Sequence, residues 1–213
     1  MKILVLHLSL LFLSFSINAK QVFLGPSNNS QEEIQEALID LEPGDILTLK
    51  PGEYFFEDGL SLDIDDVIFE GSGIDETILN FENQMSGAQG LLVTSNGVTI
   101  RDFAVLDAKG DAIKVIGADG IKMIRLRTEW TGGPKETNGA YGFYPVESKD
   151  VLIDGCVAIG ASDAGIYVGQ SQNIIVKNSI AQYNVAGIEI ENSFYACLLY
   201  TSPSTRDRIR SRM

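Results

Sequence analysis

The amino-acid sequence predicts an all-β solenoid, a coil of short parallel strands, from two repeating motifs and their hydrophobic pattern. The first motif is a four-residue segment whose copies begin 22 or 23 residues apart at three of four steps, at Gly90, Ala112, Gly142, Gly165 and Gly187. Apolar triplets form a second series with similar spacing, beginning at Val98, Ile121, Val151 and Ile174. In both series apolar residues alternate with variable ones, as in strands with one buried face. Like residues can then stack on like from coil to coil.

The first 19 residues are typical of a secretory signal peptide. Lys2 supplies a positive charge, an apolar run follows through Leu13, and Ala19 is a small residue before Lys20. This pattern predicts cleavage after Ala19 and a secreted or periplasmic mature protein. An uncleaved membrane anchor fits less well because the apolar run is short for a bilayer span. No stable membrane anchor is therefore expected after cleavage.

An amphipathic helix is predicted over residues 31–41, ahead of the strands. Ile34, Leu38 and Leu41 share one helical face, and Pro43-Gly44 would stop the helix. Ser30 and Glu33 have the spacing of a capping box. We expect this helix to cover the open first coil, whose exposed edge would otherwise template aggregation.

Less regular strands are predicted directly after the helix, at residues 45–49 and 66–69. One step of the second series is 30 residues long, and the extra residues lie within Thr128–Gly139. This stretch is rich in glycine, proline, asparagine and threonine, which predicts a loop inserted into one coil.

The last 17 residues, 197–213, differ in character from the rest of the chain. Cys197 to Ser202 is one translation of a transposon end used in sequencing adapters, and four arginines follow within seven residues, at 206, 208, 210 and 212. We interpret residues 197–213 as an adapter-derived, non-native tail; a natural basic tail is the alternative. The native β-helix domain is then expected to span residues 20–196 and to be truncated at its C-terminal end.

Composition excludes several classes of protein. The chain is 45% hydrophobic and 21% charged, which is typical of a globular protein. Its net charge of −13 argues against a nucleic-acid partner, because phosphate binding requires a basic face. Two cysteines are present, with no CxxC metal pair, and Cys156 is expected to be a packed thiol.

The opening of the strand region carries a resemblance to a known fold. The helix, then Pro43-Gly44-Asp45-Ile46-Leu47-Thr48-Leu49, then Pro51-Gly52-Glu53-Tyr54 resembles the start of right-handed parallel β-helix proteins of the pectin-lyase-like superfamily. Segments 138–147 and 163–173 are similar to a narrower family of exported bacterial β-helix proteins without an assigned reaction. The resemblance implies the fold over residues 21–196. It does not imply one reaction, because this fold hosts lyases, hydrolases, epimerases, esterases and non-enzymes.

One outward-facing column of the first motif is the candidate binding site. It contains Leu92, Lys114, Tyr144, Tyr167 and Glu189, and the insert with Trp130 is expected to stand beside it. Aromatic rings stack on the apolar faces of sugars, and charged groups bind sugar substituents. We therefore predict substrate-binding roles for Lys114, Trp130, Tyr144, Tyr167 and Glu189, with Lys114 facing a carboxylate or sulfate. Ordinary aromatic stacking on a sheet surface is the alternative.

Catalytic residues are not assigned. The single histidine, His7, lies in the expected signal peptide, so residues 20–196 hold no imidazole for acid–base catalysis. Asp63, Asp65 and Asp66 superficially suggest a Ca²⁺ site, but a solvated turn fits better because a calcium loop needs more ligands. No other metal or cofactor is predicted.

These observations favour an exported β-helix protein that binds or processes polysaccharide on the outward face of its strand stack. If it is an enzyme, a polysaccharide lyase or epimerase is expected. A non-catalytic structural or maturation factor of the cell envelope is the alternative, and no protein partner is identified. The negative net charge disfavours bare polyuronates unless Ca²⁺ bridges them.

Overall fold

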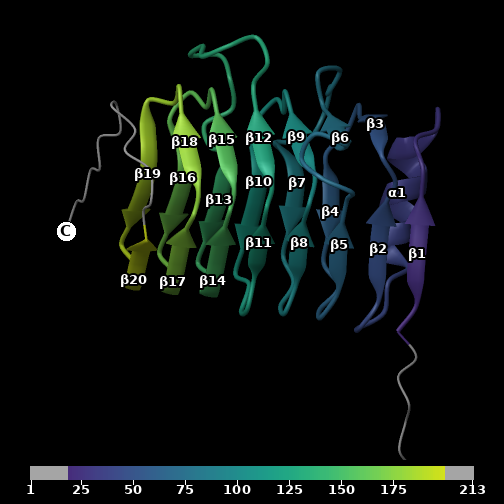
Figure 1. Ribbon diagram of the computed structural model, residues 1–213, viewed down its shortest axis with the longest axis horizontal. Helices are drawn as coiled ribbons and strands as arrows, with labels where there is room; N and C mark the ends of the chain where they lie inside the picture. Colours follow the sequence, from purple (N-terminus) through teal and green to yellow (C-terminus); the bar gives the residue numbers. More distant parts are fainter. Residues whose placement is uncertain (1–18, 200–213) are drawn as a thin grey trace, which may run out of the picture.

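A computed structural model describes residues 19–199 of the chain. These residues form a parallel β-solenoid whose coils follow one another from β1 to β20 (Figure 1). The predicted all-β solenoid is therefore confirmed. The expected signal peptide, apart from Ala19, and residues 200–213 of the expected tail lie outside the described residues.

Three parallel sheets run along the solenoid. Sheet A contains eight strands: β1 (Gln21–Leu24), β2 (Ile46–Leu49), β5 (Ile68–Glu70), β8 (Thr99–Arg101), β11 (Lys122–Ile124), β14 (Lys149–Asp154), β17 (Gln172–Lys177) and β20 (Phe194–Leu199). Sheet B contains six: β3 (Gly52–Phe55), β6 (Thr77–Asn80), β9 (Ala104–Leu106), β12 (Arg127–Glu129), β15 (Val157–Ile159) and β18 (Ile180–Gln182). Sheet C also contains six: β4 (Leu60–Leu62), β7 (Gln89–Val93), β10 (Asp111–Ile116), β13 (Phe143–Val146), β16 (Ala164–Gly169) and β19 (Ala186–Glu191).

The register between coils is the one that the repeat predicts. Ile166 pairs with Ile188 and Val168 with Ile190 in sheet C. In sheet A, Val151 and Ile153 pair with Ile174 and Val176, and all four are buried. The first motif begins with a small residue because the coils approach closely there. A Cβ atom added at Gly142 would lie 2.6 Å from the carbonyl oxygen of Gly165 in the next coil.

Sheet B is a third series of strands, which the two sequence motifs did not predict. Each of its strands from β9 onward follows sheet A after a sharp corner at a residue with positive φ: Asp102 (63°), Arg125 (47°), Gly155 (66°) and Asn178 (51°). Glycine and asparagine tolerate this conformation readily. Arg125 is held there by two hydrogen bonds of 2.6 and 2.7 Å from its guanidinium to the Asp102 carboxylate.

The core lies between the three sheets and is formed by the inward residue of each alternating pair. Phe56, directly after β3, stacks on Phe81, directly after β6 of the next coil, with ring centroids 4.7 Å apart. Phe69 of β5 packs 5.0 Å from Phe103, which follows the corner between sheets A and B. Equivalent positions of successive coils thus pack directly on one another, which buries apolar area without long-range hairpins.

The predicted helix is present as α1 (Ser30–Ile39) and packs against β1, β3 and β4 at the first coil. Ile34 and Leu38 are buried, and so is Leu41 beyond the helix end. The predicted capping box is wrong. Asn29 is the N-cap and makes no side-chain capping bond, while the Ser30 hydroxyl bonds to the backbone of Ser27.

Strand β20 extends three residues past residue 196, the expected end of the native domain. It continues through Leu199 and pairs in register with β17, with Ile175 opposite Cys197 and Val176 opposite Leu198. Residues 197–199 therefore add to sheet A, because their alternation allows Leu198 to pack on the core while Cys197 is exposed.

The stacking in sheets A and C predicts a large loss of stability on replacing one isoleucine and a small loss on replacing another on the following strand. Ile166 is fully buried in β16, whereas the side chain of Ile175 in β17 is 43% exposed. We expect Ile166→Ala to reduce the free energy of unfolding by about 2–5 kcal/mol, because it leaves a core cavity. The matched control Ile175→Ala should change it by less than about 1 kcal/mol. Urea unfolding followed by circular dichroism measures both, and equal losses would contradict the assigned register.

Candidate functional site

The outward side chains of sheet C form the candidate site. Lys114 pairs with Leu92 of β7 on one side and with Tyr144 of β13 on the other. Tyr167 of β16 pairs with Glu189 of β19, and Phe143 pairs with Ile166, which aligns Tyr144 with Tyr167. Residues 22 to 30 positions apart in sequence therefore lie on adjacent strands, about 4.8 Å apart.

Tyr141, at the end of the insert, joins this column and was not predicted. Its ring centroid lies 4.6 Å from that of Tyr144 and 4.7 Å from that of Tyr167. Tyr144 and Tyr167 meet edge to face at 5.3 Å. The backbone carbonyl of Tyr141 accepts a hydrogen bond from the Ala112 N–H, which fixes the end of the insert to β10. We call Lys114, Tyr141, Tyr144, Tyr167 and Glu189 the tyrosine face.

Lys114 is already engaged within the tyrosine face. Its ammonium lies 4.7 Å from the ring centroid of Tyr144 and 3.8 Å from the carboxylate of Asp111. Only about a fifth of its side chain is exposed, at 21%. Lys114 is expected to bind a carboxylate or sulfate of the ligand. Such a group would have to compete with the Asp111 carboxylate, which already pairs with Lys114.

Carboxylates surround the three tyrosines. The Tyr141 hydroxyl donates to Asp163 at 3.4 Å, and the Tyr167 hydroxyl donates to Glu191 at 3.1 Å. Glu147 follows β13 in a left-handed conformation, with φ of 53°, and its charge acts on Tyr144. The face is therefore both aromatic and acidic.

Burial and these charges keep the tyrosines protonated. Burial, followed by the hydrogen bond to Glu191, raises the pKa of Tyr167 to about 12. Burial also raises the pKa of Tyr141, with Asp163 adding to the effect, and that of Tyr144, with Asp111 and Glu147 adding. Burial raises the pKa of Asp111 as well, against the opposing effect of Lys114. The hydroxyls thus serve as hydrogen-bond donors at neutral pH.

Trp130 is buried at the base of the insert. Its indole is 4% exposed and its Nε1–H donates to the Ala108 carbonyl at 2.8 Å, so the ring anchors the insert to the coil before it. The segment between β12 and β13 rises away from the strands at the top of Figure 1. An apolar ring at the base of a long loop is better buried than exposed. The substrate-binding role expected of Trp130 stays a prediction.

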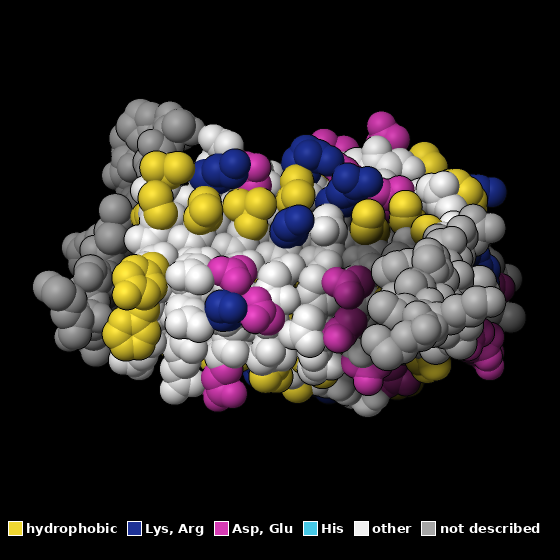
Figure 2. All heavy atoms as spheres, turned by 90° about the horizontal axis from the view of Figure 1, so that it is seen from below, with side chains coloured by type: hydrophobic (Ala, Val, Ile, Leu, Met, Phe, Trp, Pro, Cys, Tyr) yellow, Lys and Arg dark blue, Asp and Glu magenta, His cyan; other side chains and the backbone are white. Residues whose placement is uncertain are grey.

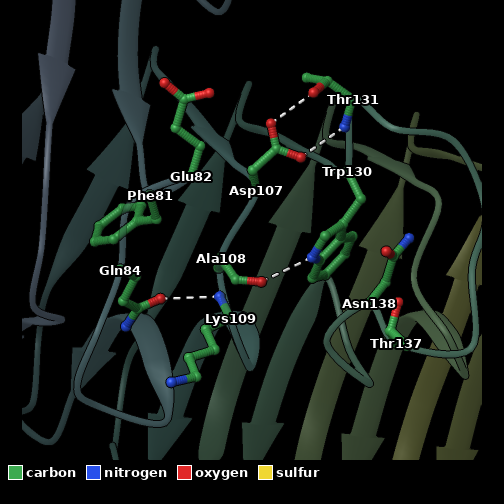
Figure 3. Close-up of a pocket in the computed structure, with 10 residues that line it drawn as sticks. All are labelled: Phe81, Glu82, Gln84, Asp107, Ala108, Lys109, Trp130, Thr131, Thr137 and Asn138. Atoms are coloured by element: carbon green, nitrogen blue, oxygen red, sulfur yellow. Dashed lines mark hydrogen bonds between the residues drawn. The ribbon is translucent and has the colours of Figure 1, made fainter.

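A pocket of about 470 Å³ lies beside Trp130 (Figure 3). Its lining is held by internal hydrogen bonds. The Asp107 carboxylate accepts from the Thr131 backbone N–H at 2.8 Å and from its hydroxyl at 2.6 Å, and Gln84 accepts from the Lys109 N–H at 2.9 Å. These bonds connect the turns of three successive coils around the pocket.

The aspartate segment at residues 63–66 and Cys156 were the other candidates from the sequence, and their contacts are those of a turn and of a packed core residue. Asp65 accepts a hydrogen bond from the Asn96 backbone N–H at 2.7 Å, and Asp66 adopts a left-handed conformation with φ of 58°. Within residues 19–199, no group of three or more histidine, cysteine, aspartate or glutamate side chains is arranged to hold a metal ion. Cys156 is a packed thiol, as expected: it is buried, and burial raises its pKa to about 12.

The face seen from below carries both charge types. Hydrophobic side chains form a row along the long axis of the molecule, and basic and acidic side chains lie on either side of this row (Figure 2). Ion pairs such as Arg101–Glu70 at 2.6 Å and Lys177–Asp154 at 3.2 Å contribute to this pattern. Among the described residues, no helix has the length and apolar character needed to cross a membrane.

Comparisons with known proteins bear on the fold. The family model described as right handed beta helix region matches residues 65–201. No curated protein matches the chain. The catalytic domain of a GH87 alpha-1,3-glucanase, solved in complex with tetrasaccharides, has a TM-score of 0.64 at 17% identity, over 79% of this chain and 31% of that one. An alginate lyase from Paenibacillus sp. str. FPU-7 has a TM-score of 0.53 at 16% identity, over 82% and 66%. A rhamnogalacturonan lyase has a TM-score of 0.51 at 10% identity, over 90% and 65%.

These structures are longer than the chain. The chain spans about a third of the length of the glucanase domain and about two thirds of each lyase. At such low identity, the similarity shows the fold alone.

The two cysteines predict a simple result for thiol labelling. A disulfide-exchange reagent should modify one thiol, Cys197, in the folded protein and two after denaturation, because the Cys156 thiol is buried and protonated. In the Cys197→Ser variant the remaining thiol, Cys156, should not react rapidly in the folded protein and should react after denaturation. Rapid labelling of that folded variant would show that Cys156 is accessible.

The raised pKa of Tyr167 predicts a loss of stability in alkali. In the unfolded chain a tyrosine ionises near pH 10, whereas in the folded protein Tyr167 does so near 12. Its contribution is therefore complete below pH 10 and is lost as the pH rises from 10 to 12. The thermal midpoint should fall over this window, and less steeply in Tyr167→Phe. An identical fall in both proteins would contradict the assignment.

Proposed function

This chain belongs to the right-handed β-helix family, and we propose that it binds a polysaccharide along the tyrosine face of sheet C. The single observation that carries the proposal is the contact of three tyrosine rings from two adjacent coils, with centroids 4.6 to 5.3 Å apart. Aromatic side chains of this kind offer flat apolar surface to the faces of sugar rings while their hydroxyls donate hydrogen bonds.

The shape of the face fits an extended ligand. Lys114, Tyr144, Tyr167 and Glu189 lie on four neighbouring strands, so the column is about 15 Å long. A straight track of this length suits several consecutive units of a polymer better than a compact metabolite, which proteins bind in enclosed pockets. Rigid strands set the spacing, so the rings need little reorganisation on binding.

The structural neighbours support the same class of ligand. The glucanase domain was solved with tetrasaccharides, and the lyases are named for alginate and rhamnogalacturonan. These names describe those proteins. For this chain they favour carbohydrate among the ligands that a solenoid face can bind.

We limit the proposal to binding because the residues of the face suit binding better than catalysis. A lyase or epimerase needs a base to remove a sugar proton. Lys114 is engaged by Asp111 and Tyr144, and the raised pKa values of the tyrosines keep their hydroxyls protonated. Trp130 has a positioning role in this proposal, since it anchors the insert that ends at Tyr141. The proposed location is outside the cytoplasm, in line with the predicted signal peptide.

Replacing two rings tests the proposal. The double variant Tyr144→Ala/Tyr167→Ala should weaken binding of its best oligosaccharide about 5- to 140-fold, because each stacked ring contributes about 0.5–1.5 kcal/mol. Affinity electrophoresis on a panel of soluble polysaccharides, followed by calorimetry with oligosaccharides, measures the loss.

Two controls separate binding from folding. Tyr144→Phe/Tyr167→Phe keeps the rings and should retain most of the affinity. Phe55→Ala removes a ring that is 48% exposed on β3 of sheet B and should have no effect on binding. If the alanine double variant binds as well as the wild type while circular dichroism shows it folded, the tyrosine face is structural and the proposal fails.

A further inference from the structure

We propose that the tyrosine face selects a polysaccharide with free amino groups, such as a partly N-deacetylated polyhexosamine, and discriminates against polyuronates. This inference rests on the proposed function of that face and adds the chemical class of its ligand. Two observations carry it: carboxylates surround the aromatic rings, and the single lysine among them already contacts a carboxylate and a ring of the same surface.

The charges of the face are strongly unbalanced. Lys114 and five carboxylates interact with the three tyrosines, and those carboxylates belong to Asp111, Glu147, Asp163, Glu189 and Glu191. Two of them, Asp163 and Glu191, accept hydrogen bonds from tyrosine hydroxyls at the edges of the rings. A carboxylate that accepts one hydrogen bond retains further lone pairs for a second donor. The rings are thus bordered by acceptor groups with negative charge.

Lys114 is poorly placed to attract an anionic ligand. It has Asp111 at 3.8 Å and the Tyr144 ring at 4.7 Å, and both interactions favour the ammonium where it is. A uronate carboxylate would have to displace Asp111, on a face that carries four further carboxylates. The overall charge of −13 opposes its approach as well.

The same contacts of Lys114 show how this surface accommodates a cation. An ammonium lies over one tyrosine ring with a carboxylate beside it. The adjacent ring, Tyr167, has Glu191 bonded to its hydroxyl and Glu189 as its neighbour on β19. Tyr167 is therefore a second tyrosine with carboxylates beside it, one coil further along the face. An amino sugar presents both a ring face and an ammonium, and therefore matches this surface.

The experiment compares ligands that differ only in their amino groups. Wild-type protein is titrated with a glucosamine hexamer, its fully N-acetylated counterpart and an oligogalacturonate of equal length. The titrations are made at about pH 6 and low salt, where ordinary carboxylates are ionised. We expect the glucosamine hexamer to bind at least about tenfold more tightly than the acetylated one, and the oligogalacturonate to bind most weakly. The preference for the amine should shrink in high salt, because added ions screen exposed charges.

Charge-neutralising variants locate the effect. Asp163→Asn/Glu191→Gln keeps the size of both side chains and one acceptor oxygen on each, but removes their charge, and should remove most of the preference for the glucosamine hexamer over the acetylated one. Glu36→Gln/Glu57→Gln is the matched control. It changes the net charge equally at exposed positions near the first coils and should retain the preference.

The outcomes distinguish this inference from the proposed function. Equal affinity for the two hexamers, or tighter binding of oligogalacturonate, overturns the inference while glycan binding stands. An equal loss of preference in both double variants also overturns it, since the effect would then come from net charge rather than from this face. If no ligand of the three, and no other polysaccharide of the panel, binds at all, the proposed function fails and the inference fails with it.

Discussion

In-register stacking of equivalent residues from coil to coil is the constraint on which the whole structure depends. Each strand has one inward and one outward set of side chains, so a slip of a single residue would turn the core residues of a coil toward solvent. Ile166 on Ile188 and Val151 on Ile174 are examples of the register that prevents this. The corners follow from the same constraint. Each coil must return to the same position, which requires left-handed residues such as Asp102 and Asn178 at equivalent points.

The candidate site is a by-product of this stacking. Once the inward residues are in register, the outward residues are too, and side chains far apart in sequence form a continuous column. Lys114, Tyr144, Tyr167 and Glu189 are neighbours for that reason alone. A solenoid can therefore build an elongated binding surface by changing single outward residues without altering the core.

Electrostatics distinguishes the face of this chain from a generic glycan-binding surface. Asp111 neutralises Lys114, and Asp163 and Glu191 border the rings. Burial of the rings and these negative charges act in the same direction on the tyrosine pKa values, keeping the hydroxyls as donors. Several negative charges thus surround tyrosine hydroxyls that stay protonated, and this combination is the basis of the proposed preference for amino groups.

The period of the sequence by itself determined the solenoid, the register of sheets A and C and the column from Lys114 to Glu189, because stacking acts on each repeat locally. It also indicated the helix at the first coil, through its apolar face. Tertiary structure decided what depends on loops and on contacts between coils. Tyr141 joins the tyrosines because the insert returns to β10, and Trp130 is buried because the same insert needs an anchor. Lys114 is engaged by Asp111 and a ring because side-chain direction on the strand brings them together. The strands of sheet B are short and rich in small or polar residues. Their alternation of apolar and polar residues is too weak to predict them from the sequence, and only the folded coil shows where they lie.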